Sequence, residues 1–583
     1  MRDDELGSLA QFAAGHPRLS GLIAGLTHGL CLALAFPPIG LWGFVFLAPL
    51  PLVLLGHLTR RRSFLAAFWC GIGMAPWWLL GHIWVVRVSA FGLVPLVITL
   101  SACTGLAVYL GAFVQRRAAW MLACWPIIWV GCDFFRGAIL ADGYAWYFLA
   151  HPLAETSVLN WPAAILGTYA VTLLVTLPAT ACVLWLIHMR AAATSLTAVS
   201  AVWVLLGFVV DPWPSASRTL KVAVVQTNVP QDVKLDWSMT QRFDDLQAMR
   251  RLIIAAAQDG PDVIVLPESM CPGWTLDAES LELERQAGLF FEYQPADSPP
   301  WKMEVTTLAD ELIALQGALG IPIVIGGPGY EGLELRPDDD GFWWYEADKN
   351  FNSVFVIEDG RAPTKRYDKI ALTPFGEYMP YIGAWPWLEH RLLGLGARGM
   401  SFGLDPGQST APLTVSLGEE GGEVVRLATP VCFEATRPAV CRRLVGPTGH
   451  ADAMFNLTND GWFGSWKPGK EHHLLTARWR CIELGVSMVR AANTGISCAI
   501  DQRGQVLASG ALDIRTGERV ESNREGVLLV DLPLTDGRTI YARIGDIVGW
   551  ACLGVCAGLV ALSAAAARSS RRGDRTPSEP EAR

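Results

Sequence analysis

The chain has 583 residues, of which 51% are hydrophobic, and its mean hydropathy is +0.31. Soluble globular chains rarely combine these values, so a membrane protein is indicated. The net charge of −9, without a long Lys/Arg run or an RNA-binding aromatic motif, argues against a nucleic-acid partner.

Eight apolar windows approach or exceed the about 20 residues with which a helix crosses a bilayer. They cover residues 19–36, 39–57, 64–86, 91–113, 118–134, 163–188, 191–210 and 546–567. We therefore predict a membrane domain of seven transmembrane helices at 1–210, an eighth helix at 546–567 and a basic tail at 568–583. The window at 118–134 is short and ends in Asp133, which leaves an interfacial or re-entrant segment as the alternative.

Positive charge between the windows predicts how the helices are oriented, because cytoplasmic loops carry an excess of Lys and Arg. The opposite loops hold little positive charge, mainly Arg87 and Arg136. With eight spans, every basic cluster falls on one side; the clusters are Arg60–Arg62, Arg116-Arg117, Arg190 and the arginines after residue 567. Both termini are then cytoplasmic, and the block 211–545 lies outside the cytoplasm.

The block 211–545 reads as a layered α/β domain. Short β-branched runs predict strands at 221–225, 263–266, 321–325 and 353–357, and apolar residues at helical spacing predict a helix from Met239 to Ala257. Strands that are apolar on both faces and separated by helices indicate a sheet that is covered on each side. Residues 334–350, rich in Asp and Trp, predict an exposed loop or lid.

Three residues of this block, Glu268, Lys369 and Cys432, are the components of acyl-transfer chemistry: a base, a cation for an oxyanion and a thiol nucleophile. Singly, each has an ordinary alternative as a carboxylate at a strand end, a solvated lysine or a thiol in the core. Turn-forming sequences surround all three, and sites in α/β domains form where the chain leaves the sheet. The three residues therefore predict one site.

No metal or cofactor is expected. The thirteen cysteines show neither a CxxC pair nor zinc spacing, and the odd count leaves at least one thiol free. The pair His472-His473 lacks the spacing of a metal-binding HExxH motif.

These motifs resemble those of the bacterial apolipoprotein N-acyltransferases, whose catalytic domain belongs to the nitrilase (carbon–nitrogen hydrolase) superfamily. The matching stretches are 225–228, Leu266-Pro267-Glu268, Asn352-Ser353, Lys369 with 374–377, Cys432-Phe433-Glu434, 459–464, 490–497 and 541–546, and in the membrane half 36–38, Arg136-Gly137, Gly143 and Trp146. The resemblance therefore covers nearly the whole chain. It implies an α/β fold in which a multi-span helical membrane domain carries an extracytoplasmic nitrilase-like αββα sandwich.

The resemblance also implies a role for each site residue. Glu268 is the general base, Lys369 stabilises the oxyanion, and Cys432 is the nucleophile that becomes thioacylated. Supporting and substrate-binding positions are Glu377, Glu434, Trp462 and Tyr378. The implied reaction moves a fatty acyl chain from a membrane phospholipid to the free α-amino group of an apolipoprotein's N-terminal S-diacylglyceryl cysteine. The implied enzyme is a monomer of the cell inner membrane, with its catalytic domain in the periplasm.

Other interpretations remain open. A membrane-anchored amidase would use the same triad with water as the second nucleophile, although one anchor would suffice for a soluble substrate. A transporter or scaffold with an inactive nitrilase-like module would need a broken triad, and charges within the apolar windows are sparse. The alternative role of Trp462 is ordinary packing. The alternative role of Glu434 is that of a carboxylate that stabilises a helix N-terminus.

Overall fold

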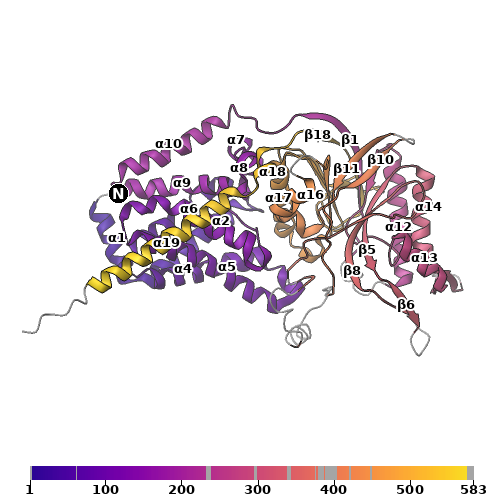
Figure 1. The fold of residues 1–583 in the computed structure, drawn as a ribbon, viewed down its shortest axis with the longest axis horizontal. Helices are drawn as coiled ribbons and strands as arrows, with labels where there is room; N and C mark the ends of the chain where they lie inside the picture. Colours follow the sequence, from indigo (N-terminus) through magenta and orange to yellow (C-terminus); the bar gives the residue numbers. More distant parts are fainter. Residues whose placement is uncertain are drawn as a thin grey trace, which may run out of the picture. The chain divides into compact units, whose positions relative to one another are not determined.

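The computed structural model describes residues 3–573 except 61, 231–237, 295–298, 338–342, 375, 379–386, 388–402, 419–421 and 447–449. The chain forms two compact units, shown as a ribbon in Figure 1. The first contains residues 1–83, 93–211 and 546–583, and the second contains residues 84–92 and 212–545.

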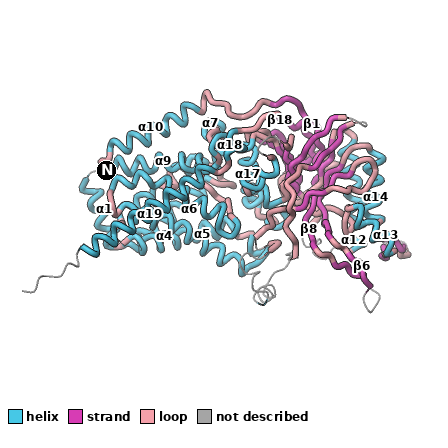
Figure 2. Tube along the Cα trace, in the orientation of Figure 1, coloured by secondary structure: helices cyan, strands magenta, loops and turns pink. Residues whose placement is uncertain are grey.

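The first unit is built of helices, which are cyan in Figure 2. They are α1 (Asp3–Gly15), α2 (Pro17–Ala35), α3 (Leu50–Leu58), α4 (Ser63–His82), most of α5 (Val85–Gln115), α6 (Trp125–Phe134), α7 (Ser157–Asn160), α8 (Ala163–Leu166), α9 (Thr168–Leu186), α10 (Arg190–Leu206) and α19 (Ile547–Gly573), with short 3-10 and π turns between them. Among the described residues, six helices are long and apolar enough to cross a membrane: 17–35, 63–82, 92–115, 119–142, 168–186 and 547–568. Shorter apolar helices lie over the predicted spans 39–57 and 191–210.

Helices α2 and α4 pack with their backbones in close approach. A Cβ atom at Gly21 would lie within contact distance of the Ala66 carbonyl, and one at Gly25 would meet the Cys70 carbonyl. Small residues at four-residue spacing allow such an approach, which is a common packing mode of membrane helices.

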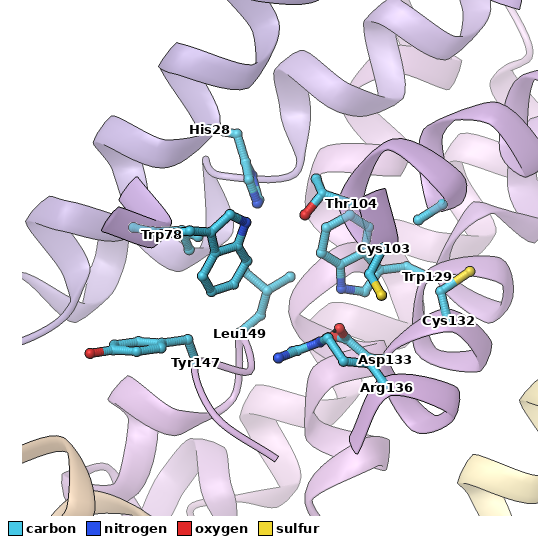
Figure 3. Close-up of a pocket in the computed structure, with 12 residues that line it drawn as sticks. His28, Trp78, Cys103, Thr104, Trp129, Cys132, Asp133, Arg136, Tyr147 and Leu149 are labelled. Carbon is cyan, nitrogen blue, oxygen red and sulfur yellow. Dashed lines mark hydrogen bonds and ion pairs between the residues drawn. The ribbon is translucent and has the colours of Figure 1, made fainter. Parts of the chain in front are cut away.

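A small cavity of about 20 Å³ lies among the helices of the first unit, with space for about one water molecule. Figure 3 shows His28, Trp78 and Trp129 around it, together with Asp133 and Arg136. Arg136 Nη2 lies 3.1 Å from Asp133 Oδ1, and the guanidinium also donates to a backbone carbonyl 2.8 Å away. The two buried charges therefore compensate each other inside the helical unit.

The second unit contains two large sheets, whose strands are magenta in Figure 2. The eight-stranded sheet has the order β17 (Arg519–Val520), β16 (Ala511–Leu512), β18 (Gly526–Thr535), β1 (Ala216–Gln226), β2 (Val263–Val265), β5 (Ile323–Glu331), β8 (Lys349–Ile357) and β9 (Arg366–Asp368). The six-stranded sheet has the order β10 (Leu413–Leu417), β11 (Glu423–Ala428), β12 (Ala453–Thr458), β13 (Met488–Ala492), β14 (Cys498–Ile500) and β15 (Val506–Ser509).

Successive side chains along a strand point to opposite faces of the sheet, and the second unit therefore has two hydrophobic cores. In β1, Val222 and Val224 face a core shared with the six-stranded sheet, whereas Ala223 and Val225 face helices. Helices α12 (Met239–Ala257), α13 (Ala278–Ala287) and α14 (Thr307–Leu319) lie on one side of the strands in Figure 1, and α16 (Pro438–Val445) and α17 (Lys467–Leu484) lie on the other. The predicted αββα sandwich and multi-span helical domain are confirmed, as are the predicted strands and α12.

The segment 334–350 differs from its prediction as a loop. It contains β6 (Glu334–Pro337) and β7 (Trp343–Glu346), which pair antiparallel. The aromatic residues Trp343, Trp344 and Tyr345 favour a strand here, which the Asp-rich composition of the segment obscured.

Candidate active site

The structure brings Glu268, Lys369 and Cys432 together from three different strand ends. Glu268 follows β2, Lys369 follows β9, and Cys432 follows β11 and begins the 3-10 helix η7 (Cys432–Thr436). Their exposed fractions are 6%, 1% and 9%, so the site is almost closed to solvent.

Lys369 lies between two carboxylates. Its Nζ is 2.8 Å from Glu377 Oε2 and 4.0 Å from Glu268 Oε1, and it also donates to the Thr373 hydroxyl at 3.2 Å. Burial alone would lower the pKa of Lys369, but the charges of Glu377 and Glu268 raise it overall. Lys369 is therefore a permanent cation at this site.

Glu268 is fixed at both oxygens. Oε1 accepts a hydrogen bond from Asn352 Nδ2 at 2.8 Å, and Oε2 accepts one from the backbone N–H of Asn459 at 2.8 Å. Asn352 Nδ2 also donates to Glu377 Oε1 at 3.3 Å, so one amide orients both carboxylates.

Cys432 has a φ of +49°, a left-handed conformation that is unfavourable for a side chain other than glycine. Burial raises the pKa of its thiol, and the Glu268 charge raises it further, whereas Lys369 opposes both effects. The thiol is therefore neutral at rest, and it needs a base to become a nucleophile.

Glu434 connects the turn of Cys432 to the turn of Lys369. Its Oε1 accepts from the backbone N–H groups of Ile370 and Ala371 at 2.8 and 2.9 Å, and its Oε2 accepts from Val431 N at 2.8 Å. The Tyr367 hydroxyl donates to the same carboxylate at 2.9 Å. Burial raises the pKa of Glu434 to about 7, although these hydrogen bonds and the Lys369 charge favour its ionised form. Glu434 is fully buried, and it orders two site turns at once.

A second polar network lies behind the turn that carries Cys432. Arg490 Nη2 donates to both Asp460 oxygens at 2.9 and 2.8 Å, and Nη1 donates to Asn456 Oδ1 at 2.6 Å. The His473 ring lies between Asp460 Oδ1, 2.9 Å from Nδ1, and the Cys432 carbonyl oxygen, 3.3 Å from Nε2. These supporting roles were missed from the sequence, although Asp460 and Arg490 lie in the motifs that carried the family resemblance.

The structure describes both predicted substrate-binding residues, Trp462 and Tyr378. Trp462 is half-buried in the 3-10 helix η8 (Asp460–Phe463), and Tyr378 is half-buried and forms an isolated bridge with Pro374. The neighbouring Met379-Pro380 lies outside the described residues. Within the part of the chain that the structure describes, no group of three His, Cys, Asp or Glu side chains could hold a metal ion.

A permanent cation, a fixed carboxylate and a neutral thiol, enclosed together, are suited to nucleophilic acyl transfer. Two family models match the chain: the carbon–nitrogen hydrolase model over residues 221–538, and the model of the apolipoprotein N-acyltransferase N-terminal domain over residues 28–181. The first match covers more than half of the chain, and the chain belongs to the carbon–nitrogen hydrolase family.

Relatives that match over both units define the class of enzyme within this family. An apolipoprotein N-acyltransferase from Geobacter metallireducens is 29% identical over 94% of this chain and 96% of its own length. One from Nitrosomonas europaea is 27% identical over 94% of this chain and 98% of its own length. Among solved structures, an amidase from Nesterenkonia sp. is 16% identical, with a TM-score of 0.33 over 55% of this chain and 92% of its own. The family resemblance seen in the sequence is confirmed: the chain is a multi-pass membrane acyltransferase of the apolipoprotein N-acyltransferase type.

Proposed function

We propose that this enzyme transfers a fatty acyl chain from a membrane phospholipid to the α-amino group of an apolipoprotein's N-terminal S-diacylglyceryl cysteine. One observation carries the proposal: the Cys432 thiol is enclosed with the charges of Glu268 and Lys369 in a chain whose other unit is made of membrane-length helices. Both substrates carry acyl chains, so a membrane-embedded enzyme suits them.

In the first half-reaction, Glu268 takes the proton from the Cys432 thiol, and the thiolate attacks an ester carbonyl carbon of the phospholipid. The carbonyl π-bond opens to an oxyanion, which Lys369 and a backbone N–H stabilise. The tetrahedral intermediate then collapses, and the carbon–oxygen bond to glycerol breaks. The departing oxygen takes the proton back from Glu268, so a lysophospholipid leaves and a thioester remains on Cys432.

In the second half-reaction, the lipoprotein's free amine attacks the thioester carbonyl. Glu268 accepts a proton from the amine nitrogen, an amide bond forms, and the carbon–sulfur bond breaks. The thiolate regains a proton from Glu268, which returns the enzyme to its resting state. Because the same base and oxyanion stabiliser serve both steps, the reaction is a ping-pong transfer.

The remaining site residues support this cycle. Glu377 keeps Lys369 charged, as its 2.8 Å ion pair suggests, and Glu434 fixes the turns that carry Lys369 and Cys432. Trp462 and Tyr378 line the acyl-chain entry. As predicted from the charges between spans, the enzyme has eight spans, and its catalytic domain at 211–545 lies outside the cytoplasm. As the family resemblance implies, it is a monomer of the cell inner membrane, with that domain in the periplasm.

The decisive experiment traps the first half-reaction. Purified protein is incubated with phospholipid in detergent micelles, quenched in acid, digested and analysed by mass spectrometry. We expect an acyl adduct on the Cys432 peptide that disappears when an amino-terminal diacylglyceryl peptide is added. Cys441→Ala, which removes another buried thiol of the same core, is the matched control and retains the adduct. Release of ammonia from small amides without any such adduct would instead establish the amidase.

A further inference from the structure

The start of one membrane-length helix belongs to the second unit. Residues 84–92 follow the apolar helix that ends at His82 and include the first turns of α5, yet they form one compact unit with residues 212–545. The Trp84 ring packs edge-to-face against Phe463, with 4.7 Å between ring centroids. The Arg87 guanidinium occupies the space in which a Cβ atom of residue 464 would lie, so it contacts the backbone of Gly464.

The charge of Arg87 is not neutralised within the part of the chain that the structure describes, where no carboxylate forms an ion pair with it, and its side chain is exposed. A second cation, Lys470, lies close by. Burial lowers the pKa of Lys470, and the charge of Arg87 lowers it further. Lys470 donates to the Thr494 carbonyl at 2.6 Å. The nearby carboxylate of Asp460 is already paired with Arg490. Lys470 is buried and also donates to Asn523 Oδ1, so Arg87 supplies the exposed positive charge at this edge of the second unit.

The loop 459–464 connects Arg87 to the candidate active site. Its first residue, Asn459, donates its backbone N–H to Glu268 Oε2 at 2.8 Å, and its last residue, Gly464, contacts Arg87. The 3-10 helix between them rises by about 2 Å per residue, so the guanidinium lies on the order of 10 Å from the proposed base. In a phospholipid, only the glycerol unit separates the ester carbonyl from the phosphate, which is a comparable span.

We propose that Arg87 binds the phosphate group of the phospholipid acyl donor while the donor's ester carbonyl lies at Cys432. A guanidinium presents paired N–H donors that match phosphate oxygens. Trp84, one turn earlier, is of the residue type that concentrates at the level of lipid headgroups. This proposal rests on the proposed function, and it adds the feature of the donor that the enzyme recognises.

The test compares a donor that carries a phosphate with one that does not. The rate of acyl-adduct formation on Cys432 is measured with dioleoylphosphatidylethanolamine at increasing mole fraction in mixed micelles, and separately with p-nitrophenyl hexanoate. For Arg87→Gln, we expect the half-saturating mole fraction of phospholipid to rise about tenfold, as expected for the loss of one charged hydrogen bond. The maximal rate stays within about twofold, because the phosphate is bound equally in ground and transition states.

The phosphate-free ester should react with Arg87→Gln as it does with the wild type, and Arg87→Lys should lie between the two for phospholipid. Arg251→Gln, which removes an exposed arginine of α12, is the matched control. Unchanged saturation with phospholipid would overturn the proposal. An equal loss with both donors would also overturn it, because Arg87 would then act by positioning the loop 459–464. If the unsubstituted enzyme formed no adduct from phospholipid at all, the proposed function itself would fail, and that result requires no Arg87 variant.

Discussion

The backbone at Cys432 is held in a conformation that costs about 1–3 kcal/mol for a non-glycine residue. Such a conformation persists only where its surroundings fix it. Glu434 fixes the chain on one side through Val431 N, and the His473 ring lies 3.3 Å from the Cys432 carbonyl oxygen. The thiol is therefore positioned by groups that have no direct part in the proposed chemistry.

Glu434→Gln should disturb two turns at once. Both oxygens of Glu434 accept backbone N–H groups, and an amide would place a donor against one of these donors. We expect a loss of about 1–3 kcal/mol in unfolding free energy and a marked fall in acylation rate. Tyr367→Phe, which removes one hydroxyl donor and leaves the backbone hydrogen bonds, is the control and should cost less. Equal thermal stability of wild type and Glu434→Gln in detergent would contradict this role.

Glu268→Gln isolates the proposed base. Glutamine keeps the size of the side chain and an oxygen acceptor for Asn459 N, but it cannot take a proton from Cys432. We expect adduct formation from phospholipid to slow at least about a hundredfold, a typical contribution of a general base. Single-turnover mass spectrometry measures this rate, while the melting temperature checks the fold. An adduct formed at the wild-type rate would assign the base to another group.

At the scale of elements, one buried ion pair joins three parts of the six-stranded sheet and its covering helix. Asp460 follows β12, Arg490 lies in β13, and His473 lies in α17. Burial alone would raise the pKa of Asp460, but the Arg490 charge and the hydrogen bonds of Arg490 and His473 lower it overall. The pair therefore stabilises the folded state at pH values above about 3.9, the unfolded pKa of Asp, and this contribution falls as the pH drops toward the folded pKa.

Arg490→Gln should consequently be a pH-dependent defect. At pH 7 the variant leaves the Asp460 charge buried without its main counterion, at a cost of about 3–5 kcal/mol. Below about pH 4 the carboxylate can protonate in the variant, so its difference from the wild type narrows. Melting followed by tryptophan fluorescence at pH 7 and pH 4 measures both differences. The control is Arg285→Gln, which breaks the exposed ion pair with Asp310 and should change the melting temperature very little at either pH. A loss of stability in Arg490→Gln that is the same at both pH values would contradict the argument.

Buried polar residues such as Arg490 determine which strands could be predicted from the sequence. The strands β1, β2, β5 and β8 are short β-branched runs that are apolar on both faces, so a local pattern sufficed. The strands of the six-stranded sheet were not predicted, because β12 and β13 carry Asn456 and Arg490 in otherwise apolar runs. Both polar side chains are buried, because Arg490 donates hydrogen bonds to Asn456 and to Asp460. Partners more than 30 positions apart are invisible to a pattern read over a few residues.

The site was predictable to a similar depth. Glu268, Lys369 and Cys432 could be selected because each follows a strand within a recognisable motif, and their catalytic roles remain predictions. Glu434 was noticed, but the way in which it orders the Lys369 turn depends on backbone N–H groups more than 60 residues away. No local pattern reveals that contact.

For the whole molecule, the asymmetry of basic residues predicts the topology. Clusters such as Arg60–Arg62 and Arg116-Arg117 should lie in the cytoplasm with both termini, and residues 211–545 should lie outside it. Alkaline phosphatase and fluorescent-protein fusions at about residue 300 and at the C-terminus should give opposite signals. Equal signals at the two positions would exclude the eight-span arrangement. The test is necessary because the six long helices alone do not determine the number of spans. The eight-span arrangement also requires the shorter apolar helices at 42–58 and 190–206 to cross the membrane.

The last prediction concerns why the catalytic unit is part of a membrane protein. Each CH₂ of an acyl chain costs roughly 0.8 kcal/mol to expose to water, so neither lipid substrate would reach a distant soluble site efficiently. A fragment cut at about residues 215 and 540 keeps both sheets, but it loses the membrane helices and the segment 84–92 that belongs to its compact unit. We expect it to fold, to act slowly on a short-chain soluble ester and to act poorly on bilayer phospholipid. Circular dichroism and adduct formation with the two donors measure these properties. Processing of bilayer lipid at the full-length rate would show that the helices serve another purpose, and it would favour an enzyme for soluble substrates.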